Sequence, residues 1–172
     1  MKKIVLTGPE SSGKTTLAAQ LAEHFGTVWV PEFSRQYLAQ IKRPYEELDL
    51  LGMARGQAAL EDEMAAQARN ELLFLDTSLE VLKIWSEVRF GRCHPWILGE
   101  MSARLPDLYL LCLPDLPWEP DPLRENPDDR DMLLGIYRRE INALGVPCSE
   151  VKGSGKERFE NAVKVVNRHL NT

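Results

Sequence analysis

Short apolar runs alternate with longer amphipathic segments along the whole chain. Five segments have the composition of short strands, four of them dominated by apolar residues: residues 3–7, 27–30, 72–75, 108–113 and 147–151. The segments between them repeat apolar positions every three or four residues, which predicts helices. Strands that alternate with helices favour a parallel sheet covered by helices on both faces. We therefore expect an α/β fold with a five-stranded parallel sheet.

The predicted helices cover most of the remaining chain. They are expected at residues 14–25, 32–40, 48–69, 77–89, 95–103, from about 128 to 144, and 157–170. Two glycines interrupt the long third helix. The sequence Thr-Ser-Leu-Glu at residues 77–80 has the form of a capping box, which predicts that Thr77 caps the fourth helix.

One domain spanning residues 1–172 is the predicted organisation, because no linker or repeat divides the chain. Residues 114–127 hold five of the eleven prolines, so they predict a loop. The loop lies between the fourth strand and a helix, and we interpret residues 114–130 as a lid segment.

The composition favours a small-molecule partner. Hydrophobic residues make up 44% of the chain, which is typical of a globular protein. The net charge of −5 argues against a nucleic-acid binder, since such proteins usually gain affinity from a basic surface. No run approaches the roughly 20 apolar residues of a membrane helix, and the N-terminal apolar stretch is too short for a signal peptide. We expect a cytoplasmic protein without a membrane partner. The sequence does not indicate its oligomeric state.

The strongest motif is the sequence GPESSGKT at residues 8–15, which matches the P-loop pattern at every fixed position. It follows a predicted strand and opens a predicted helix, so its backbone N–H groups can surround a phosphate. Lys14 is expected to reach the β- and γ-phosphates of ATP, and the Thr15 hydroxyl to ligate Mg²⁺. The predicted fold is thus a three-layer P-loop NTPase. The residues expected to bind the cofactor are Gly8, Glu10, Ser11, Ser12, Gly13, Lys14, Thr15 and Thr16.

Two carboxylates stand at the ends of predicted strands, where ligands bind in open parallel sheets. Asp76 ends the third strand and is predicted to hold Mg²⁺ with Thr15, although it could instead cap a helix. Glu32 follows the second strand and could accept the proton of a hydroxyl or bind a ribose diol. Arg35, one turn later, could hold a phosphate or the substrate, or simply pair with Glu32. Either carboxylate could be the base, and ATP is not distinguished from GTP, since base contacts would come from backbone near residues 151–156.

The lid segment carries two candidate arginines. Arg124 and Arg130 could neutralise the phosphoryl group during transfer, as closing loops do in kinases, or they could belong to a solvated charged loop. The predicted catalytic residues are therefore Lys14, Glu32, Asp76, Arg124 and Arg130.

Several motifs together resemble the nicotinamide-riboside kinase domain of the NadR family. They are GPESSGKTTL at residues 8–17, PEFSRQYL at 31–38, LFLDTS at 73–78, GRCHPW at 91–96 and WEPDPLR at 118–124. The resemblance implies a P-loop fold of the nucleoside-kinase type. It also implies an ATP- and Mg²⁺-dependent kinase that phosphorylates the 5′-hydroxyl of nicotinamide riboside in NAD salvage. It places Glu32 and Asp76 at the substrate and Mg²⁺ positions. One departure is Pro122, which stands where the family usually has glycine. The adenylyltransferase and DNA-binding parts of NadR lie outside the resemblance, so it implies no repressor role.

A cationic pyridinium ring would favour an aromatic face near carboxylates, and Tyr37, Trp85 or Trp118 could supply that face. The predicted substrate-binding residues are Glu32, Arg35, Tyr37, Asp76 and Trp118. Two alternatives remain open. The acceptor could be another nucleoside or a thiamine-like molecule, or the chain could be a non-catalytic ATP-binding regulatory module. A GTPase is disfavoured because no asparagine is followed by lysine, which the guanine-reading motif requires.

Overall fold

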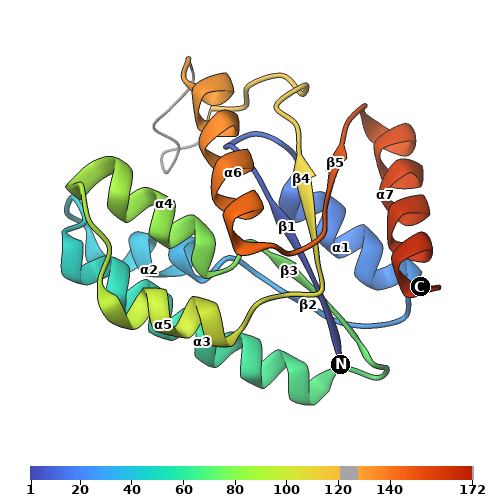
Figure 1. Cartoon of the computed structure of the whole chain (residues 1–172), viewed down its shortest axis with the longest axis horizontal. Coiled ribbons are helices and arrows are strands. Elements are labelled where there is room, and N and C mark those ends of the chain that lie inside the picture. Colours follow the sequence, from blue (N-terminus) through green and yellow to red (C-terminus); the bar gives the residue numbers. More distant parts are fainter. Residues whose placement is uncertain (121–127, 172) are drawn as a thin grey trace.

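A computed structural model of the chain describes residues 1–120 and 128–171. Within these residues the strands form a single parallel sheet in the order β2-β3-β1-β4-β5 (Figure 1). The strands are β1 (Lys2–Thr7), β2 (Trp29–Val30), β3 (Leu72–Asp76), β4 (Leu108–Cys112) and β5 (Cys148–Val151). The five-stranded parallel sheet predicted from the sequence is confirmed, although β2 is shorter than expected.

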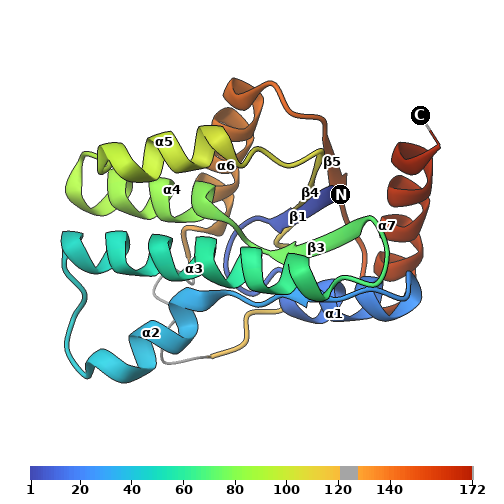
Figure 2. The ribbon, with the colours of Figure 1, turned by 90° about the horizontal axis from the view of Figure 1, so that it is seen from below.

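Helices cover both faces of this sheet and make three layers (Figures 1 and 2). They are α1 (Lys14–His24), α2 (Phe33–Ile41), α3 (Glu47–Gln67), α4 (Leu79–Phe90), α5 (Pro95–Ala103), α6 (Arg130–Leu144) and α7 (Gly155–Leu170). One face carries α1 and α7, and the other carries α3, α4 and α6, with α2 and α5 packed outside them. No helix in the described part of the chain is long and apolar enough to cross a membrane.

Strands β3 and β4 are nearly all apolar, and β1 is apolar from Ile4 to Leu6, because both faces of the sheet are covered there. In β1, Ile4 and Leu6 pack toward α1 and α7, whereas Val5 packs toward α4 and α6. Successive side chains of a strand point to opposite faces, so a continuous apolar run fills two separate cores. This packing fixes the carboxyl ends of β1 and β3 side by side, with Leu6 opposite Asp76.

The predicted capping box at the start of α4 is wrong. The helix begins at Leu79 after Ser78, and no side chain caps it. Thr77 instead has a left-handed backbone with φ of 66°, and its N–H donates to the Leu6 carbonyl at 2.9 Å. Thr77 is therefore part of the turn that closes the end of β3, because pairing with β1 satisfies its backbone before the helix starts.

The two glycines of α3 do not interrupt the helix but let α2 approach it. A Cβ at Gly52 would lie 2.9 Å from the Tyr37 hydroxyl oxygen, and one at Gly56 would lie 2.0 Å from Cε1 of Phe33. The backbone N–H of Phe33 also donates to Oε1 of Gln57 at 2.8 Å. These contacts hold the start of α2, and with it Glu32, against α3.

Candidate active site

The P-loop is a curled segment between β1 and α1. Gly8 has φ of 132°, and a Cβ there would lie 2.5 Å from the carbonyl oxygen of Cys112, so only glycine fits. Gly13 precedes α1 in a left-handed conformation with φ of 74°. The helix N-terminus that follows provides unpaired N–H groups and positive potential for an anion. The backbone thus forms the phosphate-binding arrangement that the motif predicts.

Lys14 is held at this loop by the loop's own oxygens. Its Nζ donates to the carbonyls of Gly8 at 2.9 Å and Pro9 at 2.8 Å, and to the Ser12 hydroxyl at 3.4 Å. The ammonium is therefore positioned at the loop, where it would meet the negative charge of a bound phosphate.

Asp76 and Thr15 meet at the carboxyl end of the sheet, although 61 residues separate them. The Thr15 hydroxyl donates to Oδ2 of Asp76 at 2.5 Å. Burial raises the pKa of Asp76, although the hydrogen bond from Thr15 and the charge of Lys14 oppose this. Oδ1 of Asp76 is buried and has no hydrogen-bond partner among the described residues. An unpartnered carboxylate oxygen beside a hydroxyl fits a hard cation such as Mg²⁺, which prefers oxygen ligands.

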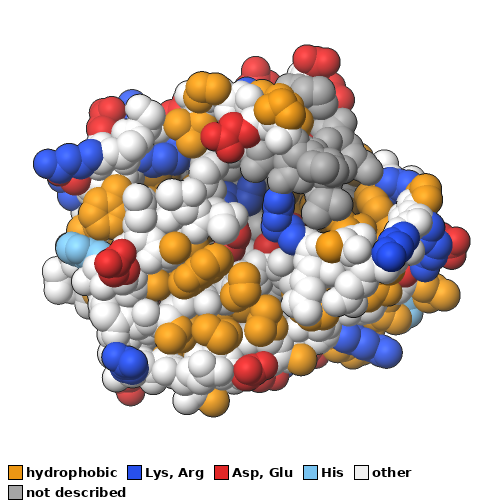
Figure 3. All heavy atoms as spheres, turned by 180° about the vertical axis from the view of Figure 1, so that it is seen from behind, with side chains coloured by type: hydrophobic (Ala, Val, Ile, Leu, Met, Phe, Trp, Pro, Cys, Tyr) orange, Lys and Arg blue, Asp and Glu red, His pale blue; other side chains and the backbone are white. Residues whose placement is uncertain are grey.

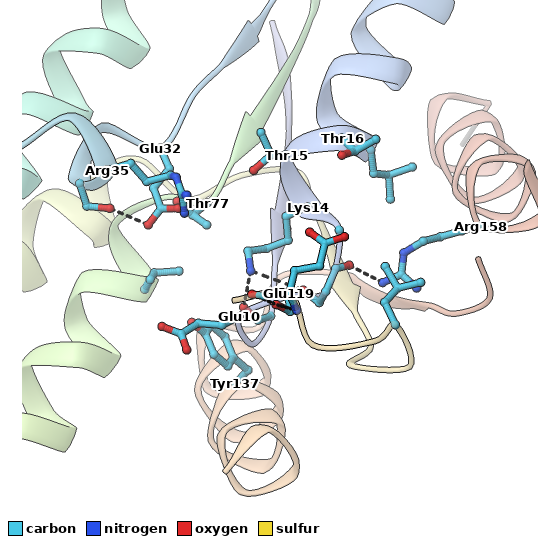
Figure 4. A pocket seen from close by; sticks show the side chains of 18 of the residues that line it. Glu10, Lys14, Thr15, Thr16, Glu32, Arg35, Thr77, Glu119, Tyr137 and Arg158 are labelled. Carbon is cyan, nitrogen blue, oxygen red and sulfur yellow. Dashed lines mark hydrogen bonds between the residues drawn. The ribbon is translucent and has the colours of Figure 1, made fainter. Parts of the chain in front are cut away.

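A single pocket of about 310 Å³ joins the P-loop to the start of α2 (Figure 4). Seen from behind, the surface there is recessed and carries basic side chains next to the undescribed residues (Figure 3). The pocket is lined by every predicted cofactor-binding residue and by two predicted substrate-binding residues, Glu32 and Arg35. Further lining residues from α2, α4, α6 and the turn after β3 are Ser34, Leu38, Thr77, Val81, Trp85 and Tyr137.

Glu32 lines this pocket at the start of α2. It occupies the N-cap position of α2, and the Ser34 hydroxyl donates to its Oε1 at 2.5 Å. Trp85 of α4 and Tyr137 of α6 contribute aromatic rings to the lining. Burial raises the pKa of Tyr137 well above its ordinary value, so the phenol stays neutral. The pocket therefore combines a carboxylate with uncharged aromatic side chains.

Four predicted site residues that the structure describes do not line the pocket: Asp76, Tyr37, Trp118 and Arg130. The Tyr37 hydroxyl donates to Oδ1 of Asp49 at 3.0 Å, in the contact between α2 and α3. Arg130 donates to the Leu116 carbonyl at 2.9 Å, and its Cζ lies 5.8 Å from the centre of the Trp118 ring. Arg124 and Pro122 fall outside the described residues. The roles predicted for these side chains stay predictions.

Comparison with known proteins identifies the family. The chain matches the family described as AAA domain over residues 3–158. The chain belongs to this AAA domain family. Because the match extends from β1 to α7, it includes the P-loop, Asp76, Glu32 and the residues that line the pocket.

Curated relatives of this AAA domain chain include two NadR proteins. The trifunctional NAD biosynthesis/regulator protein NadR of Salmonella typhimurium is 27% identical to this chain, over 96% of this chain and 42% of the relative. The NadR protein of Escherichia coli is 30% identical over 130 residues, which cover 72% of this chain and 31% of the relative. The chain thus spans less than half the length of the curated relatives that it matches.

Solved structures confirm the P-loop kinase fold of this family member. A NadR protein crystallised in complex with NR superposes with a TM-score of 0.77 and 19% identity, over 99% of this chain and 52% of that one. A NadR complex with NAD and AMP-PNP gives the same TM-score and identity, over 98% of this chain and 49% of that one. A deoxyadenosine kinase from M. mycoides superposes with a TM-score of 0.60 and 15% identity, over 96% and 99% of the two chains. The predicted nucleoside-kinase type of fold is therefore confirmed.

Sequence reasoning assigned no role in the pocket to three residues that line it: Thr77, Tyr137 and Arg158. Arg158 is 4% exposed, and its guanidinium donates to carbonyls of three separate segments and to Asp115. Tyr137 lies on the buried face of the amphipathic helix α6, so its place in the hydrophobic pattern did not distinguish it from a core residue. The left-handed conformation of Thr77 could be recognised only from the structure, since its sequence context is that of a helix cap.

Proposed function

We propose that this chain is an ATP- and Mg²⁺-dependent kinase that transfers the γ-phosphoryl group of ATP to the 5′-hydroxyl of nicotinamide riboside. One observation carries the proposal. The phosphate-binding loop and Glu32 line the same pocket, so a nucleotide and a hydroxyl acceptor can meet within it. Phosphoryl transfer depends chiefly on positioning and electrostatics, which this arrangement supplies.

The nucleotide side of the reaction is assigned to the P-loop. The loop N–H groups and Lys14 bind the phosphates, and the ammonium exchanges its contacts with Gly8 and Pro9 for phosphate oxygens. Thr15 and Asp76 would hold Mg²⁺, which when bound supplies positive charge against the phosphate oxygens.

The acceptor side is assigned to Glu32 and its neighbours. Ser34 fixes the carboxylate through Oε1, so Glu32 can orient the 5′-hydroxyl and accept its proton as the phosphoryl group leaves ATP. Trp85 and Tyr137 can face a pyridinium ring, because cations are attracted to aromatic faces. Arg35 remains the candidate for the substrate or a phosphate. Arg124 and Arg130 remain candidates for neutralising the transferred group, and Tyr37 and Trp118 for the substrate.

The relatives support this assignment. The curated NadR proteins are described as trifunctional in NAD biosynthesis and regulation, and NadR structures contain NR, or NAD with AMP-PNP. This chain aligns with less than half of each curated relative, so only a function that fits its own pocket is carried over. A riboside kinase fits, because the phosphate site and the acceptor carboxylate are both present.

A panel of acceptors tests the proposal. Nicotinamide riboside, adenosine, uridine and thiamine are each incubated with the protein, Mg-ATP and, in parallel, Mg-GTP, and products are identified by mass spectrometry and ³¹P NMR. We expect a 5′-phosphate on nicotinamide riboside. Turnover confined to another nucleoside or to thiamine would reject this acceptor, and nucleotide binding without any turnover would favour a regulatory module.

Glu32→Gln removes the proposed base while preserving shape, and we expect kcat to fall about 10²–10⁴-fold. Glu23→Gln, on the exposed face of α1, is the matched control and should leave kcat unchanged. An unchanged turnover number for Glu32→Gln would remove Glu32 from catalysis.

A further inference from the structure

Thr77 combines an unusual backbone with a place in the pocket. Its φ of 66° lies in the left-handed region, which β-branched residues rarely adopt because Cβ approaches the backbone. The hydrogen bond from its N–H to the Leu6 carbonyl holds the turn in this conformation. Glycine would adopt the same conformation without strain, so the backbone conformation does not explain why this residue is threonine. Strain of this kind at a pocket points to a use for the side chain.

The Thr77 side chain is placed to contact an acceptor. The residue is only 3% exposed, yet it lines the pocket together with Glu32 and Arg35 (Figure 4). It directly follows Asp76, whose carboxylate meets Thr15. In the described part of the chain the Thr77 hydroxyl makes no hydrogen bond, in contrast to the Thr15 and Thr27 hydroxyls, which donate to Asp76 and to the Leu72 carbonyl. A hydroxyl in a pocket wall can both donate and accept, which matches a second hydroxyl.

We propose that the Thr77 hydroxyl binds a sugar hydroxyl of the phosphoryl acceptor and thereby selects ribosides over their deoxy analogues. The proposal rests on the proposed function, since it concerns the acceptor of the same pocket. Thr77 is then a substrate-binding residue beside Glu32. The Glu32 carboxylate can only accept hydrogen bonds, whereas the Thr77 hydroxyl can also donate one. The two groups together can therefore bind more of a sugar's hydroxyls than either one alone.

Thr77→Val tests the proposal because valine keeps the β-branched shape and lacks the hydroxyl. The substrates are nicotinamide riboside and its 2′-deoxy and 3′-deoxy analogues. We expect kcat/KM on the riboside to fall about 3–10-fold, as for one lost hydrogen bond, and the Kd for ATP to stay unchanged. On the analogue that lacks the contacted hydroxyl, Thr77→Val should cause no further loss, because the interaction is already gone.

Thr77→Ser keeps the hydroxyl and should recover most of the activity. Thr7→Val is the matched control, since Thr7 is also a buried threonine near the P-loop but does not line the pocket. Should Thr77→Val fail to fold by circular dichroism, Thr77→Ala removes the hydroxyl with less bulk. An equal loss on all three substrates, or no loss on any, overturns the role of Thr77 while the kinase assignment stands. A folded wild-type protein that phosphorylates no riboside overturns the proposed function and this inference with it.

Discussion

Nη2 of Arg158 donates a hydrogen bond of 2.6 Å to the Ser12 carbonyl, although 146 residues separate the two along the chain. The same guanidinium donates to the carbonyls of Leu113 and Gly153 and to Oδ1 of Asp115. Asp115 in turn accepts a hydrogen bond from the Gly153 N–H at 2.7 Å. One buried arginine therefore ties the P-loop to the end of β4, the first part of the lid segment and the loop before α7.

Removing this arginine should loosen the P-loop. Arg158→Gln leaves buried carbonyls without donors, and we expect a loss of about 2–4 kcal/mol in the free energy of unfolding. Affinity for ATP should fall about tenfold, corresponding to roughly 1.4 kcal/mol. Urea unfolding and calorimetry with Mg-ATP measure the two effects. Arg158→Lys should not restore them, because an ammonium cannot reproduce the planar fork. Arg168→Gln, exposed near the end of α7, is the control, and an equal effect there would contradict the role of Arg158.

Glu80 should make the protein less stable as pH rises. It is 1% exposed, and burial raises its pKa from an ordinary 4.5 to about 7. Glu61 adds negative charge nearby, and the charge of Glu80 in turn helps to raise the pKa of Tyr109 and Tyr137. Below about pH 4.5 the carboxyl is protonated in both the folded and the unfolded state, so it does not lower the free energy of unfolding. Between pH 4.5 and 7 only the unfolded chain ionises, and above pH 7 the full penalty of about 3 kcal/mol applies.

Glu80→Gln imitates the protonated carboxyl, so it should stabilise the protein by up to about 3 kcal/mol more at pH 8 than at pH 4.5. Urea unfolding at a series of pH values measures this difference. Glu63→Gln, on the exposed side of α3, should show no such trend. A difference between Glu80→Gln and wild type that does not change with pH would contradict the raised pKa.

Tyr45 should matter for the acceptor although it does not line the pocket. Its ring stacks on Trp85, with centroids 6.3 Å apart and an interplanar angle of 29°, and Arg89 Cζ lies 4.0 Å from its centre. Tyr45→Ala removes this support from Trp85, and we expect the KM for the acceptor to rise about 3–10-fold, as for one aromatic pair. Steady-state kinetics should show the KM for ATP unchanged. Tyr45→Phe keeps the ring and should behave as wild type; a loss as large as that of alanine would argue against stacking.

Gly56→Ala should disturb the position of Glu32 through α2. The added Cβ would lie 2.0 Å from Cε1 of Phe33, so α2 must move away from α3. We expect a loss of about 1–3 kcal/mol in stability, as for other overpacked sites, together with a lower kcat. Gly99→Ala in α5 meets no atom within 4 Å and should instead stabilise its helix by up to about 1 kcal/mol. Thermal unfolding and kinetics of both variants distinguish steric conflict from a general effect of alanine.

The fold could be predicted from the sequence because its signals are local. A strand that ends in a P-loop and an apolar run that ends at Asp76 each occupy a few consecutive residues, and the parallel order of the sheet places their ends together. The meeting of Thr15 and Asp76 at 2.5 Å follows from that geometry. The positions of Lys14 and Glu32 in one pocket follow from it as well.

What only the tertiary structure decided depends on contacts between segments far apart in the chain. Arg158 has no local pattern that links it to Ser12, and the left-handed conformation of Thr77 is held by the hydrogen bond that its N–H donates to the Leu6 carbonyl of β1. Tyr37 pairs with Asp49 because two glycines of α3 admit α2, a matter of shape that hydrophobic spacing does not encode. Hydrophobic periodicity indicates which face of a helix or strand is buried. It does not indicate which distant residues pack against that face, because those contacts form only in the folded chain.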